Sequence, residues 1–232
     1  RIARSLLSRL ENEKTGEILL EELNTEIPDY RIEETKNLVS ILGNEVVEEF
    51  PWANGMKPST NDNVEGVLRR TWRPALSIVG SDGMPSTANA GNVLRPYTTL
   101  QLSMRIPPMV DPKKAVDAIE KILKNDIPYG ASVELEFEEA AEGWNAPESK
   151  TWLLDAIEKA SKKYFNEMPC TIGEGGTIPF MAMLGKQFPK AQFVITGVLG
   201  PQSNAHGPNE FLHIPFAKNL TCCISSIITD FK

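Results

Sequence analysis

Apolar residues recur along the chain with a spacing that changes from helical to extended and back. Ile2, Leu6 and Leu10 follow the i, i+4, i+8 spacing of an amphipathic helix, and Gly16 ends the run a turn or so later. The acidic stretch 17–49 returns to helical spacing over Tyr30–Leu42, after a break at Pro28. We expect this stretch to be a solvated helical insertion.

From Pro74 onward the apolar spacing becomes that of extended strands. The apolar run 75–79 predicts a buried strand, and the alternation over Thr98–Ile106 and again over Ser132–Phe137 predicts half-buried strands. Asp111 and Pro112 supply an N-cap and a first-turn proline for a helix that ends near Asn125. These elements predict an α+β fold, a small sheet with helices on one face.

A long loop joins the first two predicted strands. Residues 80–96 contain too many Gly, Pro and Asn residues for regular structure. Long ordered loops in compact domains often carry function, and a flexible surface connection is the alternative.

A second module follows an acidic, aperiodic boundary near Gly143 and Pro147. Its apolar spacing predicts helices over 150–165, 179–188 and 215–230, and a β-branched strand over 192–198. We therefore divide the chain into domains 1–143 and 144–232. The second is too short for a complete doubly wound sheet, so we interpret it as the C-terminal part of an α/β domain whose first half lies upstream.

Charge and composition narrow the classes of function. The net charge of -7 leaves no broad basic surface, so nucleic acid is not an expected partner. No apolar run reaches the roughly 20 residues of a membrane span, and no signal peptide precedes the first helix. The chain has 3 cysteines and 2 histidines, with Cys222 and Cys223 adjacent, so neither a disulfide framework nor a self-contained zinc finger is expected. We expect a soluble, cytoplasmic protein.

Three segments carry candidate chemistry. Thr171–Phe180 places three glycines ahead of a helix, where backbone N–H groups can hold a carboxylate, although glycines of a simple tight turn explain the pattern equally well. His206 lies among small and turn-forming residues that leave its imidazole accessible to a metal or substrate. Arg105 ends a strand on its polar face, where a guanidinium can bind a carboxylate or remain an ordinary surface cation.

Five motifs, taken in order and spacing, resemble those of the two-zinc exopeptidases that include carnosinases, cytosolic non-specific dipeptidases, carboxypeptidase G and the aminoacylases. The resemblance covers nearly the whole chain and is closest to the dipeptidase branch. The motifs are Thr71-Trp-Arg-Pro74, Ala90-Gly-Asn-Val-Leu-Arg-Pro96, Leu102-Ser-Met-Arg-Ile-Pro107, Glu174-Gly-Gly-Thr-Ile-Pro179 and Ala205-His-Gly-Pro-Asn-Glu210.

The resemblance implies an α/β catalytic domain that binds two zinc ions, interrupted by a lid. The lid would be a four-stranded antiparallel sheet with two helices on one face, which also forms a homodimer. Residues 1–143 match the lid and 144–232 match the end of the catalytic domain. By the same resemblance, His206 ligates a metal, either Zn or in its place Mn or Co, and Arg105 holds the terminal carboxylate of a small peptide substrate. Asn92 reaches the substrate from the lid loop, either within one copy or across the dimer, and Glu174, Gly175, Gly176 and Thr177 line the pocket.

The family's other zinc ligands and its catalytic glutamate have no match in this chain, so the resemblance places them upstream of residue 1. We therefore expect the chain alone to be inactive, as one part of an enzyme that performs metal-assisted hydrolysis. Two alternatives stay open. One is an amidohydrolase for N-acyl amino acids, and the other is a non-catalytic dimerisation or binding module on the same scaffold.

Overall fold

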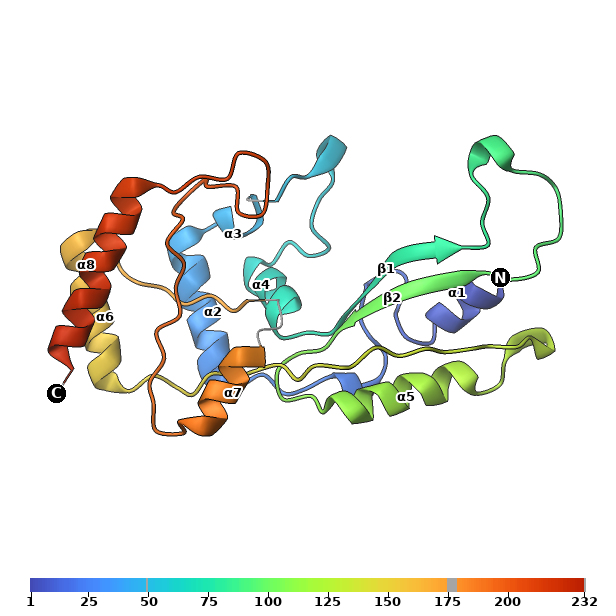
Figure 1. Ribbon diagram of the computed structural model, residues 1–232, viewed down its shortest axis with the longest axis horizontal. Helices are drawn as coiled ribbons and strands as arrows, with labels where there is room; N and C mark the ends of the chain where they lie inside the picture. Colours follow the sequence, from blue (N-terminus) through green and yellow to red (C-terminus); the bar gives the residue numbers. More distant parts are fainter. Residues whose placement is uncertain (49, 175–178, 232) are drawn as a thin grey trace. The chain divides into compact units, whose positions relative to one another are not determined.

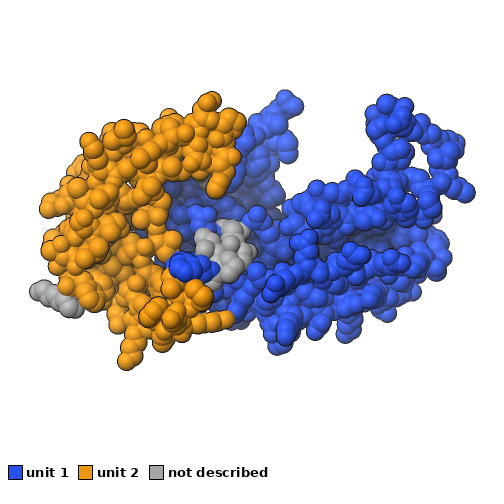
Figure 2. Space-filling model, viewed as in Figure 1, with its two compact units in different colours: residues 1–145, 172–182 blue, residues 146–171, 183–232 orange. Residues whose placement is uncertain are grey.

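The computed structural model describes residues 1–48, 50–174 and 179–231, and divides the chain into two compact units. Unit 1 comprises Arg1–Asn145 and Ile172–Ala182, and unit 2 comprises Ala146–Thr171 and Met183–Lys232 (Figure 2). The chain therefore passes between the units after Asn145, after Thr171 and after Ala182. Neither unit is one continuous stretch of sequence.

Unit 1 combines helices with a β-hairpin (Figure 1). Its elements are α1 (Ile2–Leu7), α2 (Asp29–Leu42), α3 (Glu45–Glu48), α4 (Asn63–Thr71), β1 (Ala75–Asp82), β2 (Thr99–Arg105) and α5 (Pro112–Lys124). Short 3-10 turns lie at Glu21–Leu23, Ala53–Gly55, Thr87–Asn89 and Pro128–Gly130. The helix expected after Asp111 is confirmed, since the Asp111 side chain accepts hydrogen bonds from the backbone N–H groups of Lys113 and Lys114.

The sheet has two antiparallel strands among the described residues, whereas four were expected. Ala75 pairs with Arg105 at one end and Asp82 with Thr99 at the other, with a bulge between Ile78 and Gly80. The prediction of a buried first strand is wrong for its second half, because Ile78 and Val79 are more than half exposed. Val79 falls at the bulge, outside the paired register, whereas Ile78 pairs with Leu102 and shares its face, which the core covers only in part at this position.

The segment expected as a third strand, Ser132–Phe137, is extended but is not assigned to a strand. Val133 and Leu135 are partly buried against the core while Glu134 and Glu136 are exposed, as the alternation predicts, but Phe137, expected on the same face as Val133, is 43% exposed. Alternation requires only an extended backbone, and a ladder also requires a partner strand in register. The sequence pattern therefore predicted the faces of residues 133–136 correctly, and its predictions for Phe137 and for the strand pairing are wrong.

The core of unit 1 lies on one face of the hairpin, where the region of α1 and helix α5 cover it. Leu10 and Leu123 are buried and pack with Leu76 and Leu102 of the two strands. A neighbouring cluster joins Leu23 and Val110 to Met104. This packing holds the polar face of β2, including Arg105, toward solvent.

The acidic stretch is more than a solvated insertion. Leu38 of α2 is buried against Val46 and Val67, so α2, α3 and α4 share a small core of their own. Helix α4 was not expected from the sequence. Its N-cap is Asp62, which accepts hydrogen bonds from the backbone N–H groups of Val64 and Glu65.

Unit 2 is built on two antiparallel helices, α6 (Thr151–Tyr164) and α8 (Ile214–Asp230). Phe165 contacts Phe216 at one end of the pair, and Trp152 contacts Phe231 at the other. Helix α7 spans Pro179–Gln187. The expected strand over 192–198 is not assigned as one, and Val194, Ile195 and Val198 are exposed. No helix in the described ranges is both long and apolar enough to cross a membrane.

Candidate functional site

The residues expected to form the site are distributed over both units. Arg105, Asn92 and Glu174 belong to unit 1, and His206 belongs to unit 2. Gly175, Gly176 and Thr177 lie outside the described residues.

Arg105 is the last residue of β2, and its side chain is exposed, as the alternation of the strand predicts. The chain then turns through Pro107, which is buried, and Pro108. A Cβ on Gly143 would lie 2.9 Å from the Cα of Pro108, so residue 143 must be a glycine for the two segments to pack this closely. This packing fixes the chain that follows Arg105.

Glu174 lies toward the same end of the hairpin as Arg105. A Cβ on the preceding residue, Gly173, would lie 3.0 Å from Cγ2 of Thr71, so this segment packs against the end of α4. Thr71 stands four residues before Ala75, the strand partner of Arg105. Unit 1 therefore gathers the end of β2 and the start of the glycine-rich segment in one region.

Asn92 lies at the other end of the hairpin, in the exposed loop 83–98 that joins β1 to β2 (Figure 1). A Cβ on Gly83 would lie 2.4 Å from the carbonyl oxygen of Tyr97, so the neck of this loop is closed tightly. At about 3.3 Å per residue, β2 separates Arg105 from Thr99 by roughly 20 Å, and Asn92 lies in the loop beyond Thr99. One chain therefore presents these two side chains at opposite ends.

His206 lies at the apex of a loop, residues 199–213, which we call the His206 loop. His213 N–H donates to the carbonyl of Leu199 at 2.7 Å, and Phe211 N–H donates to that of Ser203 at 3.1 Å. The buried Ser203 hydroxyl donates to the carbonyls of Leu199 and Gly200. The base of the loop is therefore closed by hydrogen bonds, and the apex with its exposed imidazole extends from it.

The apex of the His206 loop has an unusual backbone. Four residues have a positive φ, between +54° and +61°, namely Gln202, Asn204, His206 and Asn209. Such left-handed conformations cost free energy in residues other than glycine, so local contacts must maintain them. A Cβ on Gly207 would lie 2.6 Å from the Asn204 side chain, so residue 207 cannot carry one without a shift.

Two further side chains form contacts within the apex, and one of them, Glu210, ends the Ala205–Glu210 motif. Glu210 Oε2 accepts a hydrogen bond from His206 N–H at 2.6 Å, and Asn204 Nδ2 donates to the carbonyl of Pro208 at 2.6 Å. The signal was available as the spacing of four between His206 and Glu210. The spacing alone does not predict the hydrogen bond, because contacts within a loop follow no regular period.

His213 has a structural role. Its Nδ1 accepts a hydrogen bond from Phe216 N–H at 3.1 Å and caps the N-terminus of α8.

The imidazole of His206 has the donor chemistry of a zinc ligand. The described residues, however, gather no group of three or more His, Cys, Asp or Glu side chains that could hold a metal ion. His206 therefore fits a metal as a single donor, and the donor set of a complete centre is not assembled in the described ranges.

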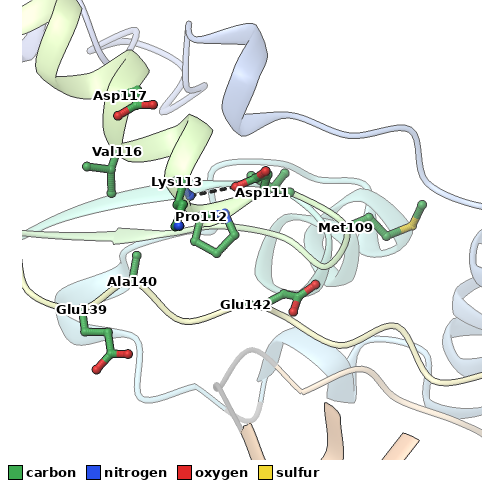
Figure 3. Close-up of a pocket in the computed structure, with 10 residues that line it drawn as sticks. Met109, Asp111, Pro112, Lys113, Val116, Asp117, Glu139, Ala140 and Glu142 are labelled. Carbon is green, nitrogen blue, oxygen red and sulfur yellow. Dashed lines mark hydrogen bonds between the residues drawn. The ribbon is translucent and has the colours of Figure 1, made fainter. Parts of the chain in front are cut away.

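A groove of about 670 Å³ lies elsewhere in unit 1, between the start of α5 and residues 139–142 (Figure 3). Met109 and Val116 contribute apolar surface, and Asp117, Glu139 and Glu142 contribute carboxylates. None of the residues that the sequence assigned to the site lines this groove. This groove is therefore separate from the site that the sequence predicts.

Known proteins resemble the chain in both sequence and structure. No protein-family model matches it. A cysteinylglycine-S-conjugate dipeptidase of Corynebacterium striatum is 30% identical over 156 residues, which are 63% of this chain and 33% of that protein. The Cys-Gly metallodipeptidase DUG1 of Saccharomyces cerevisiae is 30% identical over 142 residues, 57% of this chain and 28% of that protein.

Among solved structures, an M20 family metallo-carboxypeptidase from Sulfolobus solfataricus matches 97% of this chain and 51% of its own, with a TM-score of 0.72 and 17% identity. The fold is therefore similar to that of about half of this M20 family metallo-carboxypeptidase. The two relatives found by sequence are Cys-Gly dipeptidases, and the chain is a homologue of both. It spans about a third of the length of those relatives. The resemblance drawn from the five motifs is confirmed.

Proposed function

We propose that the chain supplies the lid and the C-terminal part of the catalytic domain of a metal-dependent dipeptidase. Residues 1–143 form the lid in this proposal, and 144–232 belong to the catalytic domain. The observation that carries the proposal is the His206 loop. In a homologue of Cys-Gly dipeptidases, it presents an exposed imidazole from a backbone conformation that the loop's own hydrogen bonds maintain.

The remaining metal ligands and the general base come, in this proposal, from polypeptide outside these 232 residues. The coverage of the relatives supports this, because the chain spans only 33% of the Corynebacterium striatum dipeptidase. The complete enzyme holds two zinc ions, or Mn or Co in their place, and His206 is one donor to one of them. A divalent metal supplies Lewis acidity toward the peptide carbonyl.

Arg105 binds the C-terminal carboxylate of a dipeptide or short peptide. Its guanidinium offers paired N–H donors that match a carboxylate, and it lies in the region of unit 1 where the Glu174 segment begins. Glu174 and residues 175–177 line the same substrate pocket. A free carboxylate is thus the feature by which the enzyme selects exopeptidase substrates.

A second copy of the chain completes the substrate site through the lid. The exposed apolar residues of the hairpin support a homodimer, since Leu94 is 100% and Val93 71% exposed in the loop that carries Asn92. Because Asn92 and Arg105 lie at opposite ends of one hairpin, Asn92 reaches the pocket of the partner copy. We further propose a cytoplasmic location, which the free Cys170, Cys222 and Cys223 support.

Replacement of His206 tests the proposal. In the complete protein, His206→Ala should lower the metal content and abolish hydrolysis of Cys-Gly, as measured by metal analysis and a ninhydrin assay. His213→Asn is the matched control, because it changes the other histidine and keeps an N-cap acceptor for α8. Unchanged metal content and activity in His206→Ala would refute the assignment.

Replacement of Arg105 tests the substrate class. Arg105→Ala should raise KM for free dipeptides far more than for C-terminally amidated ones. If the pair of Arg105 and the substrate carboxylate is buried, the fall in kcat/KM for free dipeptides should correspond to about 2 to 5 kcal/mol. Arg4→Ala, an exposed arginine of α1, is the control. A preference for N-acyl amino acids over dipeptides would identify an amidohydrolase instead. If the complete protein hydrolyses neither kind of substrate, the result would favour a non-catalytic dimerisation or binding module.

A further inference from the structure

We infer that Glu210 is a positioning residue for His206. Its carboxylate holds the His206 backbone in the left-handed conformation from which the imidazole is presented. The inference rests on the proposed function, in which His206 is a metal donor, and it assigns a separate task to a second residue of the same loop.

The contact between the two residues is short and charge-assisted. Glu210 Oε2 accepts from the backbone N–H of His206 at 2.6 Å, four residues away in sequence. Hydrogen bonds to an ionised carboxylate are shorter and stronger than those between neutral groups. Glu210 is therefore placed to offset the cost of the φ of +61° at His206.

The geometry also indicates that Glu210 acts through the backbone. Two other contacts brace the same turn without touching His206 itself, namely Asn204 Nδ2 to Pro208 O and Gly207 N–H to Asn204 O at 2.9 Å. The acceptor of the His206 N–H is a side-chain carboxylate oxygen rather than a backbone carbonyl. A change at Glu210 should thus alter the direction of the imidazole directly.

Loss of this contact should leave the rest of the loop folded. The base of the His206 loop is closed independently of Glu210, by His213 N–H to Leu199 O and by the buried Ser203 hydroxyl. Substitution of Glu210 should therefore loosen the apex alone. The thermal midpoint and the circular dichroism spectrum should stay close to those of the wild type.

The test measures zinc affinity in the complete protein by competition with a chromogenic chelator. Glu210→Ala should weaken zinc binding by about tenfold to a hundredfold, the usual range for residues that orient a metal ligand. Glu210→Gln should retain most of the affinity, because its amide oxygen can still accept from His206 N–H. Glu167→Ala, an exposed glutamate of unit 2, is the control.

The outcomes separate the inference from the proposed function. Wild-type zinc affinity in Glu210→Ala, with loss of zinc in His206→Ala, overturns the inference alone. Unchanged zinc affinity in His206→Ala overturns the proposed function. An equal loss in Glu210→Gln and Glu210→Ala also overturns the inference, because it would mean that the charge acts on the metal centre itself.

A measurement on the metal-free 232-residue chain supplies a second test. The amide proton of His206 should exchange with solvent at least several-fold faster in Glu210→Ala than in the wild type, as followed by NMR. Asn204→Asp, which removes the donor to Pro208 O, should loosen the same apex if Glu210→Ala fails to fold. An exchange rate of the His206 amide that is unchanged in Glu210→Ala would contradict the inference.

Discussion

Glu65 accepts hydrogen bonds from two arginines on the surface of unit 1. Arg73 donates Nε to Oε1 at 2.9 Å and Nη2 to Oε2 at 3.0 Å, and Arg69 donates Nε to Oε1 at 3.2 Å. The hydrogen bonds from Arg73 lower the pKa of Glu65 below its ordinary value. Partial burial opposes this shift, and Arg69 adds to it. The carboxylate therefore ties α4 to the residue that leads into β1.

The lowered pKa of Glu65 makes a prediction about acid stability. A depressed carboxyl pKa contributes stability above the unfolded value, near 4.5, and this contribution is lost as pH falls through the lower folded value. Glu65→Gln should cost about 1 kcal/mol at pH 7, since the pair is partly exposed. The difference from the wild type should shrink below about pH 4. Urea unfolding from pH 3 to 7 measures it, and a pH-independent difference would contradict the assignment.

Individual residues were predictable where a regular element sets their direction. Arg105 is exposed because the alternation of β2 requires it, and this could be taken from the sequence. The left-handed backbone of His206 could not, because it depends on the contact with Glu210 and on the space that Gly207 leaves for Asn204. Such contacts in loops follow no regular period. The sequence therefore located the motif that contains His206 but did not predict the backbone conformation of that residue.

At the scale of elements, α5 is held at both ends. Asp111 caps its N-terminus, and at its other end Arg9 donates to the carbonyls of Ile122, Asn125 and Asp126 at 3.2, 2.5 and 2.7 Å. The last carbonyls of a helix have no partner within it, so a side chain from elsewhere stabilises them. Arg9 thereby fastens the α1 region to α5 across the core of the hairpin.

Removal of Arg9 should weaken this attachment. Arg9→Ala should lower the free energy of unfolding by about 1 to 3 kcal/mol, because up to three carbonyls lose a charged donor. Arg9→Lys should recover part of the loss, since an ammonium can reach fewer of the three acceptors. The measurement is the urea midpoint at pH 7, with Arg4→Ala as the control. Equal stability of Arg9→Ala and the wild type would show that water replaces the guanidinium without cost.

The elements that the sequence predicted well carry their own start and stop signals. Helix α5 follows from Asp111, Pro112 and the apolar spacing after them. Helix α4 was missed although Asp62 and Glu65 have the three-residue spacing of a capping box. The ladder expected at Ser132–Phe137 depended on a distant partner strand, and spacing alone cannot supply one.

At the scale of the whole molecule, the hairpin separates two of the proposed substrate-binding residues. Arg105 pairs with Ala75 at one end, and the loop that carries Asn92 leaves Asp82 and Thr99 at the other. In the proposed function, a site that uses both residues on one substrate therefore combines two copies of the chain. The sequence suggested this arrangement only through family resemblance, because spacing along a strand does not reveal which copy a loop reaches.

Mixed dimers test this arrangement. Arg105→Ala and Asn92→Ala should each be nearly inactive alone in the complete protein. If the two residues of a site come from different copies, a mixed dimer keeps one site with both residues intact. An equal mixture that has exchanged subunits should then recover about a quarter of the wild-type activity. No recovery, although native mass spectrometry shows mixed dimers, would place both residues in one copy.

Because Ile172–Ala182 belongs to unit 1, that unit is not finished when residue 145 has been made. Domains generally fold as the ribosome delivers them, from the N-terminus onward. Here the ribosome must synthesise α6 before it delivers the last piece of unit 1. During that interval Thr71, at the end of α4, lacks the Gly173 backbone that later packs against it. A nascent chain stalled at residue 150 should accordingly be cut by proteases near α4 more readily than one stalled beyond residue 220.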